Sequence, residues 1–247
     1  MAGKTKEIID KLCKEGLIKD FSITVYKNNS KIKFFEKFEN NNLFYVFSAG
    51  KPLVAAVIWK LYDQKKIDFN DKISKFWPEF SKNNKNEITV KDVLTHSSGV
   101  SLSETLSDND YTDLNRISMW LENYSPESKP GQRIAYHQVT YGWILGEIIQ
   151  RITNKSFEES FEELVKKPLR LNDTRFKVKN LEELPVEIFR HTSSNLKTIP
   201  IIFKLFSINK IPLISGTCIS TSSDLALFYN QILHNKNWIS ENTKKKY

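Results

Sequence analysis

The sequence predicts one domain, residues 1–247, of the mixed α/β (α+β) class, in which an antiparallel sheet packs against helices. Three observations predict this class. Two short runs near the N-terminus alternate apolar and polar residues, as strands do, and the next run has apolar residues at helical spacing. Helix-start signals then dominate the rest of the chain. With 40% hydrophobic and 12% aromatic residues, the domain can fill a sizeable core.

The chain is expected to open with a helix and a hairpin. Residues 4–15 form an amphipathic helical pattern, and residues 21–26 and 31–36 form two strand patterns joined by a Lys-Asn-Asn-Ser turn. Because two strands alone do not make a stable sheet, we expect further strands near 171–178 and 211–220.

Helices are expected to account for most of the remaining chain. Residues 49–64 carry an apolar stripe, and Pro52 lies early enough to be tolerated in the first turn of a helix. Three later pairs have the spacing in which a hydroxyl and a carboxylate cap each other's free N–H groups: Thr89 with Asp92, Ser156 with Glu159, and Thr221 with Asp224. Helices should therefore begin near 90, 157 and 222, and the last should continue to 234.

Residues 139–152 are predicted to form another helix, with one buried side. That side consists of Val139, Trp143, Ile144, Ile148 and Ile152. Gly142 and Gly146 in this span are expected to allow close packing against another helix, since the charged Glu147 argues against a membrane dimer.

Charge and cysteine content exclude several classes of protein. The net charge of +8 is scattered, without basic residues interleaved with stacking aromatics, so no nucleic-acid partner is expected. Cys13 and Cys218 lie far apart, and the N-terminus lacks the apolar core of a signal peptide, so free thiols in the cytoplasm are expected. Prolines and lysines interrupt the apolar stretch 199–214. We interpret it as a loop or short helix over the core, with a membrane-contacting lid as the alternative, and expect no integral membrane segment.

Ser48 precedes Lys51 by three residues at the head of the helix predicted for 49–64. A serine hydroxyl becomes a nucleophile when a neighbouring group takes its proton, and this spacing puts the amine one helical turn away. A helix N-terminus also favours developing negative charge. The same spacing recurs at Ser30, Ser194 and Ser207, so on local pattern alone a plain helix cap is the more frequent role for Ser48.

Four longer blocks follow one another in the chain: FSAGKPLVAAVIWKLYDQKKIDFNDKISKFWPEF, ITVKDVLTHSSGV, KPGQRIAYHQVTYGWILGEIIQRITNKSFEESFEELVKKPLRLNDTRF and GTCISTSSDLALFYNQIL. In this order they resemble the serine β-lactamase-related family, which includes class C β-lactamases, D-Ala-D-Ala peptidases and related esterases. The segments WPEF and YHQVTYGW look most like the esterase-type branch. The resemblance implies a sheet start and nucleophile helix over 20–64, a helical region over 65–170, and a return to the sheet with a final helix over 171–247.

The resemblance also assigns roles to residues. Ser48 would form the acyl-enzyme and Lys51 would take part in proton transfer. The second family motif, Tyr-x-Asn, falls on Tyr136, His137 and Gln138. Tyr136 would shuttle a proton, while Gln138 could offer an amide to a substrate carbonyl and His137 could line the pocket. Whether Lys51 or Tyr136 is the base stays open.

The third motif of the family is Lys-Thr-Gly or His-x-Gly on an edge strand, and it supplies one N–H of the oxyanion hole. Neither triplet occurs in the 247 residues, so we expect the C-terminal strands of the sheet to be missing or reduced. Loss of one such donor typically lowers turnover about 10²- to 10³-fold.

Three hypotheses remain for the function. The first is a serine hydrolase with an esterase-like preference for a small ester or amide, the second an inactive scaffold or binding protein, and the third a fragment of a longer hydrolase. No cofactor or metal is expected, because no cluster of His, Cys and Asp has zinc-ligand spacing. His96 in LTHSSGV is expected to belong to a helix end and turn, not to act as a base. The sequence does not predict an oligomeric state.

Overall fold

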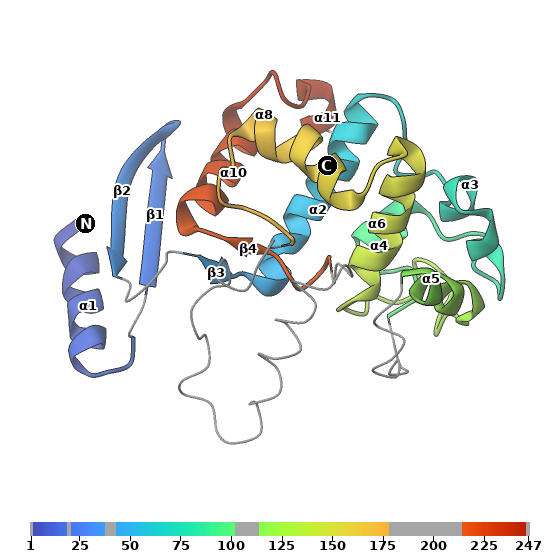
Figure 1. Cartoon of the computed structure of the whole chain (residues 1–247), viewed down its shortest axis with the longest axis horizontal. Helices are drawn as coiled ribbons and strands as arrows, with labels where there is room; N and C mark the ends of the chain where they lie inside the picture. Colours follow the sequence, from blue (N-terminus) through green and yellow to red (C-terminus); the bar gives the residue numbers. More distant parts are fainter. Residues whose placement is uncertain (1, 19–20, 38–42, 102–113, 178–213, 246–247) are drawn as a thin grey trace.

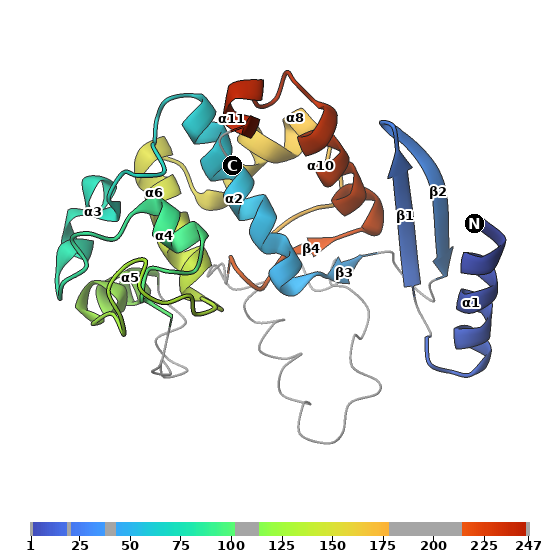
Figure 2. The same cartoon turned by 180° about the vertical axis from the view of Figure 1, so that it is seen from behind.

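The computed structural model describes residues 2–18, 21–37, 43–101, 114–177 and 214–245, and it confirms the mixed class. Figures 1 and 2 show α1 and the β1–β2 hairpin at one end of the molecule, α3 and α5 at the other, and α2 between them.

The N-terminal elements agree with the predicted helix and hairpin. Helix α1 (Ala2–Lys14) is followed by the antiparallel strands β1 (Phe21–Lys27) and β2 (Ser30–Lys37). Asn28 and Asn29 both have positive φ, as a two-residue type I′ turn requires, and asparagine tolerates that conformation.

The hairpin is fastened to α10 (Ser222–His234), which lies almost the whole chain length away in sequence. Ser22 Oγ and Ser222 Oγ are 2.6 Å apart, and Asn230 Nδ2 donates to Asn29 Oδ1 at 2.6 Å. Figure 1 shows β1 next to α10. The hairpin near the N-terminus is therefore attached to a helix near the C-terminus.

A second antiparallel pair consists of β3 (Phe44–Tyr45) and β4 (Ile219–Ser220), and Arg175 bridges to Ile219. The strands expected near 171–178 and 211–220 are thus much shorter than predicted within the described residues. The chain just before β4 forms a turn instead, because the carbonyl of Ser215 accepts a hydrogen bond from Lys51 rather than from a neighbouring strand.

Helix α2 (Lys51–Asp63) confirms the helix predicted for 49–64, except that a 3-10 turn, η1 (Phe47–Gly50), precedes it. Its predicted apolar stripe is fully buried: Leu53, Val54, Val57, Ile58 and Leu61. Burial of five such side chains contributes on the order of 1.5–3 kcal/mol each and makes α2 the centre of the core.

The remaining helical elements surround α2. They are α3 (Ile73–Phe76), η2 (Pro78–Ser81), α4 (Val90–Leu94), α5 (Leu114–Asn123), α6 (Thr140–Thr153), α7 (Phe157–Phe161), the π-helical turn η4 (Glu162–Lys166) and α8 (Lys167–Leu169). The helix starts predicted near 90 and 157 are confirmed, each with both hydrogen bonds of a capping box.

The helix start predicted near 222 is confirmed, but its capping box is only half formed. Thr221 accepts a hydrogen bond from the N–H of Asp224. The Asp224 carboxylate does not accept a hydrogen bond from the backbone N–H of Thr221. It accepts instead from the backbone N–H groups of Asp173 and Thr174, both at 2.8 Å. Asp224 therefore ties the segment before β4 to α10, which the local spacing could not reveal.

Helix α6 buries Trp143, Ile144 and Ile148 as predicted, whereas Ile152 and Val139, which precedes the helix, are half-buried. Its glycines face a turn and not another helix. A Cβ added at Gly142 would lie 2.3 Å from Ser215 Oγ and 2.6 Å from Ser215 N. Only glycine lets the turn before β4 approach α6 this closely.

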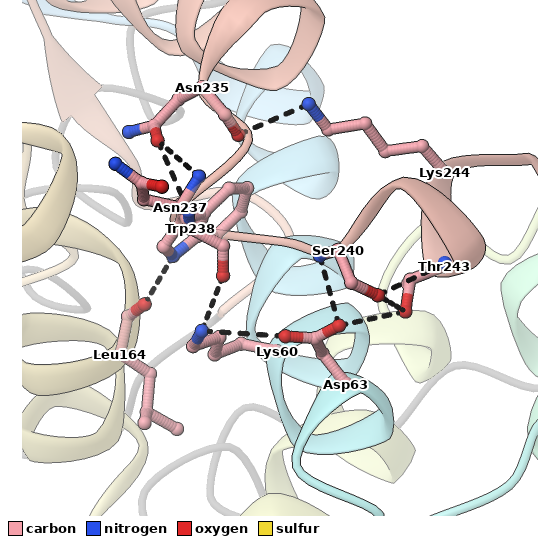
Figure 3. Close-up of polar contacts among 9 residues, drawn as sticks. All are labelled: Lys60, Asp63, Leu164, Asn235, Asn237, Trp238, Ser240, Thr243 and Lys244. Atoms are coloured by element: carbon pink, nitrogen blue, oxygen red, sulfur yellow. Dashed lines mark hydrogen bonds and ion pairs between the residues drawn. The ribbon is translucent and has the colours of Figure 1, made fainter.

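After α10 the chain returns to the C-terminal end of α2 through a short helix, α11 (Glu241–Lys245). Asp63 Oδ1 accepts hydrogen bonds from Ser240 N (3.0 Å) and Thr243 Oγ1 (2.9 Å), and Lys60 Nζ lies 3.6 Å from Asp63 Oδ2. Figure 3 shows these contacts converging on Asp63. We call this group of residues the Asp63 clamp.

No helix within the described residues is long and apolar enough to cross a membrane. The stretch 199–214, apart from Ile214, lies outside them. Cys13 and Cys218 are both free thiols, as predicted.

Candidate active site

Ser48 lies in η1 and not at the cap position of α2. The residue before α2 is Gly50, no side chain caps either η1 or α2, and the Ser48 side chain is exposed. The structure therefore does not support a helix-cap role for Ser48. Phe47, directly before it, has a φ of 46°, a left-handed conformation that costs about 1–2 kcal/mol for a residue with a Cβ. Such strain is typical of turns that present a functional side chain.

Gly50 brings this turn against the second sheet. A Cβ there would lie 2.4 Å from the Cβ of Cys218, and Val46 N donates to Cys218 O at 2.9 Å. The backbone on both sides of Ser48 is thus held against the chain that enters β4.

Lys51 brings three segments together. Its side chain is buried, and its Nζ lies 3.0 Å from Ser48 Oγ, 3.0 Å from the carbonyl oxygen of Gln138 and 3.3 Å from that of Ser215. A neutral amine has two N–H donors and one lone pair. The two carbonyls can take both donors, which leaves the lone pair for the Ser48 hydroxyl.

Burial of Lys51 favours its neutral form. Desolvation lowers the pKa of its amine, and the opposing attraction of Tyr136 is not large enough to restore the ordinary value. The geometry and the pKa direction thus agree on a lysine that can accept a proton from Ser48.

Tyr136 lies beside Lys51 at the surface. Lys51 Nζ is 4.8 Å from the centre of the Tyr136 ring, and the tyrosine is 54% exposed. Partial burial raises the pKa of the phenol, but hydrogen bonding with Lys51 and Ser48, together with the lysine charge, outweighs it and lowers the pKa overall. Tyr136 can therefore exchange protons with both residues.

His137 and Gln138 take different positions. The His137 ring is fully buried, with Nδ1 against the carbonyl of Ala135 and Nε2 2.6 Å from Ser98 Oγ. Since a carbonyl only accepts, Nδ1 carries the proton and Ser98 donates to Nε2. Gln138 has an exposed side chain, and its backbone carbonyl is the group that contacts Lys51.

Ser215 is a site residue that the sequence did not reveal. It is buried, its carbonyl binds Lys51, and its Oγ accepts from Gly142 N at 2.7 Å and donates to Val139 O at 3.3 Å. A contact made through a backbone carbonyl has no residue-type signature, so no motif could have identified it.

The site can take up a proton on Lys51 and present the Ser48 hydroxyl as a nucleophile. Among the described residues no group of three or more His, Cys, Asp or Glu side chains could hold a metal ion. Ser48 attack on an acyl carbon, with the proton passing to Lys51, is the chemistry that these positions allow.

The chain is similar to known proteins over most of its length. A family model described as Beta-lactamase matches residues 6–246. The chain is 32% identical over 127 residues to the esterase/beta-lactamase LipL of Mycobacterium tuberculosis, covering 50% of this chain and 29% of LipL. It is 28% identical over 178 residues to the teichoic acid D-alanine hydrolase of Staphylococcus aureus, covering 68% of this chain and 43% of that protein. The matched part is thus less than half the length of these curated relatives.

A solved structure shows the same fold. The crystal structure of a family VIII carboxylesterase superposes with a TM-score of 0.83 at 21% identity, covering 98% of this chain and 73% of that chain.

Proposed function

Because this chain belongs to the beta-lactamase family, we propose that it is a serine hydrolase that forms an acyl-enzyme on Ser48. The observation that carries the proposal is the 3.0 Å contact between Lys51 Nζ and Ser48 Oγ, with both amine hydrogens directed to carbonyls. A buried lysine with a lowered pKa, placed against a serine, is a feature of catalytic sites more than of structural ones.

The reaction proceeds in two steps. In the first, Ser48 Oγ attacks the acyl carbon while its proton passes to Lys51, and Tyr136 relays a proton to the departing alkoxide or amine. In the second, water attacks the acyl-serine, a carboxylic acid leaves, and the Ser48 proton is restored. Such proton transfer typically accelerates a reaction about 10²- to 10⁴-fold.

The substrate is a small ester or amide, and an ester is preferred. The names of LipL and of the carboxylesterase with the same fold support this preference, as does the glutamine at position 138 in place of the asparagine of the β-lactam-cleaving relatives. The exposed Gln138 side chain is a substrate contact, and the enclosed His137 shapes the wall behind it.

A non-catalytic scaffold is the less favoured interpretation. The strained turn at Phe47 and the desolvated amine of Lys51 both lower the stability of the fold. A catalytic site explains why they are present, whereas a scaffold would be more stable without them.

The test uses covalent labelling with a fluorophosphonate probe. The wild-type chain should be labelled and Ser48→Ala should not, while hydrolysis of a short p-nitrophenyl ester should fall to background in the same variant. Ser30→Ala is the matched control, because Ser30 has the same spacing to a lysine but lies in a hairpin. Labelling is the primary readout, because it reports attack by the Ser48 hydroxyl directly. Equal labelling of wild type and Ser48→Ala, or no labelling of the folded wild type, would overturn the proposal.

A further inference from the structure

His96 ends α4 in a conformation that suits glycine better than histidine. It has a φ of 60°, and the turn has both hydrogen bonds of a Schellman motif, from Ser97 N to Asp92 O (2.7 Å) and from His96 N to Val93 O (3.1 Å). Glycine or asparagine usually occupies this position, since other residues are strained there. The sequence interpretation of a helix end is therefore confirmed, but the turn does not explain why the residue is histidine.

The His96 side chain and backbone both bind the segment that carries Tyr136. His96 Nδ1 accepts a hydrogen bond from the backbone N–H of His137 at 3.1 Å, and the His96 carbonyl accepts from Ala135 N at 2.9 Å. These bonds hold the residues on both sides of Tyr136. For Nδ1 to accept, the ring must be neutral with its hydrogen on Nε2.

The surroundings of His96 maintain that state. Its ring centre lies 5.0 Å from that of Tyr136, 5.3 Å from that of His137 and 5.1 Å from that of Tyr141. Burial, with smaller contributions from His137 and Lys51, lowers the pKa of His96 to about 4. The titratable groups facing it are thus two tyrosines, a buried histidine and the site lysine, and at neutral pH His96 stays an acceptor.

From this geometry we infer that His96 is a positioning residue, whose Nδ1 fixes the backbone around Tyr136 and so holds the phenol against Lys51 and Ser48. This inference rests on the proposed function for its effect on rate, but not for its effect on the titration of Tyr136. His96 donates nothing to the reaction and accepts no proton from it. Its role is to keep the Tyr136 hydroxyl within reach of Lys51 and Ser48.

Two substitutions separate this role from that of a simple helix stop. His96→Gly relieves the backbone strain of the left-handed conformation but removes the acceptor for His137 N. The fold should therefore be retained, while the position of Tyr136 relative to Lys51 and Ser48 becomes less fixed. His96→Asn keeps a residue that tolerates this conformation and places an amide oxygen near the position of Nδ1. His234→Asn, on an exposed histidine at the end of α10, is the matched control.

For ester hydrolysis we expect His96→Gly to lower kcat about 10- to 100-fold with KM changed less than about threefold, because misplacing a catalytic group affects the reaction step. His96→Asn should recover most of that loss, and His234→Asn should match the wild type. Equal kcat for His96→Gly and wild type, or equal loss in the glycine and asparagine variants, would overturn the inference.

Two readouts do not depend on activity. The titration of Tyr136, taken as the ultraviolet difference between each protein and its Tyr136→Phe counterpart, should move to higher pH in His96→Gly and return in His96→Asn. In the wild type, ¹⁵N NMR should show His96 as the Nε2–H tautomer. An unchanged Tyr136 titration in His96→Gly, or an Nδ1–H tautomer, would overturn the inference even if the chain hydrolysed no ester. Absence of labelling at Ser48 would instead count against the proposed function alone.

Discussion

At Lys51 a single amine is shared by three parts of the chain, and its protonation state decides what the site can do. As an ammonium it would donate to Ser48 and to the carbonyls of Gln138 and Ser215. As a neutral amine it would keep both carbonyl contacts and accept from Ser48. Because burial lowers its pKa, the second state becomes populated at a lower pH than for a free lysine.

The rate of probe labelling should therefore rise with pH and level off with a midpoint below 10.5, the ordinary lysine value. Lys51→Arg should lose the rise and at least about 10²-fold of the rate, since a guanidinium stays protonated. Lys91→Arg, at an exposed site, should match the wild type. A labelling rate that is flat in pH, or an active Lys51→Arg, would contradict a proton-accepting Lys51.

Side chains with their own chemistry can be predicted from the sequence, but backbone contacts cannot. The resemblance of four sequence blocks to a known family singled out Ser48, Lys51 and Tyr136, and the structure brings these three side chains together. The carbonyls of Gln138 and Ser215 and the acceptor role of His96 depend on how distant segments meet. Contacts between segments that are far apart in the sequence leave no residue pattern from which they could be predicted.

At the scale of elements, the spacing of capping residues predicted where helices start. Tertiary contacts determined the partners of the Asp224 carboxylate and the length of the last strand. The boxes at Thr89 and Ser156 formed as predicted, because both partners lie within one turn of the helix. Asp224 had the same spacing, but two N–H groups of another segment took its carboxylate. The strand predicted for 211–220 is short for a similar reason, since Ser215 binds Lys51 and α6.

The contact between α6 and this turn gives a prediction about element packing. Gly142→Ala should destabilise the fold by about 1–3 kcal/mol and slow labelling, because the new Cβ would meet the backbone of Ser215 at 2.6 Å and displace its carbonyl from Lys51.

Gly146→Ala is the control in the same helix. Its Cβ would meet only the end of the Ile214 side chain, which can rotate, and both variants gain the same helix propensity. Urea denaturation and labelling rates measure the two effects. Equal behaviour of the two alanine variants would show that the approach of Ser215 to Gly142 does not matter.

At the scale of the whole molecule, the Asp63 clamp connects the C-terminal residues to the helix that carries Lys51. Burial alone would raise the pKa of Asp63, but hydrogen bonds from Ser240 and Thr243 and the charge of Lys60 outweigh it and lower the pKa. The carboxylate therefore stabilises the folded state above its unfolded pKa of about 3.9, and this contribution is lost as the pH falls through the lower folded pKa.

Asp63→Asn should lower the free energy of unfolding at pH 7 by about 1–3 kcal/mol, since charged acceptors make the stronger hydrogen bonds. The difference from wild type should shrink progressively below about pH 4. Asp10→Asn, which removes an exposed ion pair with Lys6, should leave the free energy of unfolding close to that of the wild type, because solvent screens exposed pairs. Urea melts at several pH values test this, and a difference that grew on acidification would contradict the assigned role of Asp63.

The hydrogen bond between Ser22 and Ser222 joins residues 200 positions apart. A ribosome adding about 5–20 residues per second needs roughly 10–40 s to make the chain between them, whereas a hairpin closes in microseconds. During synthesis the β1–β2 hairpin must therefore wait until α10 emerges before the contact between Ser22 and Ser222 can form. The hairpin is made long before α10 but docks only with it, and a nascent chain stalled before α10 would expose the hairpin to proteases and chaperones.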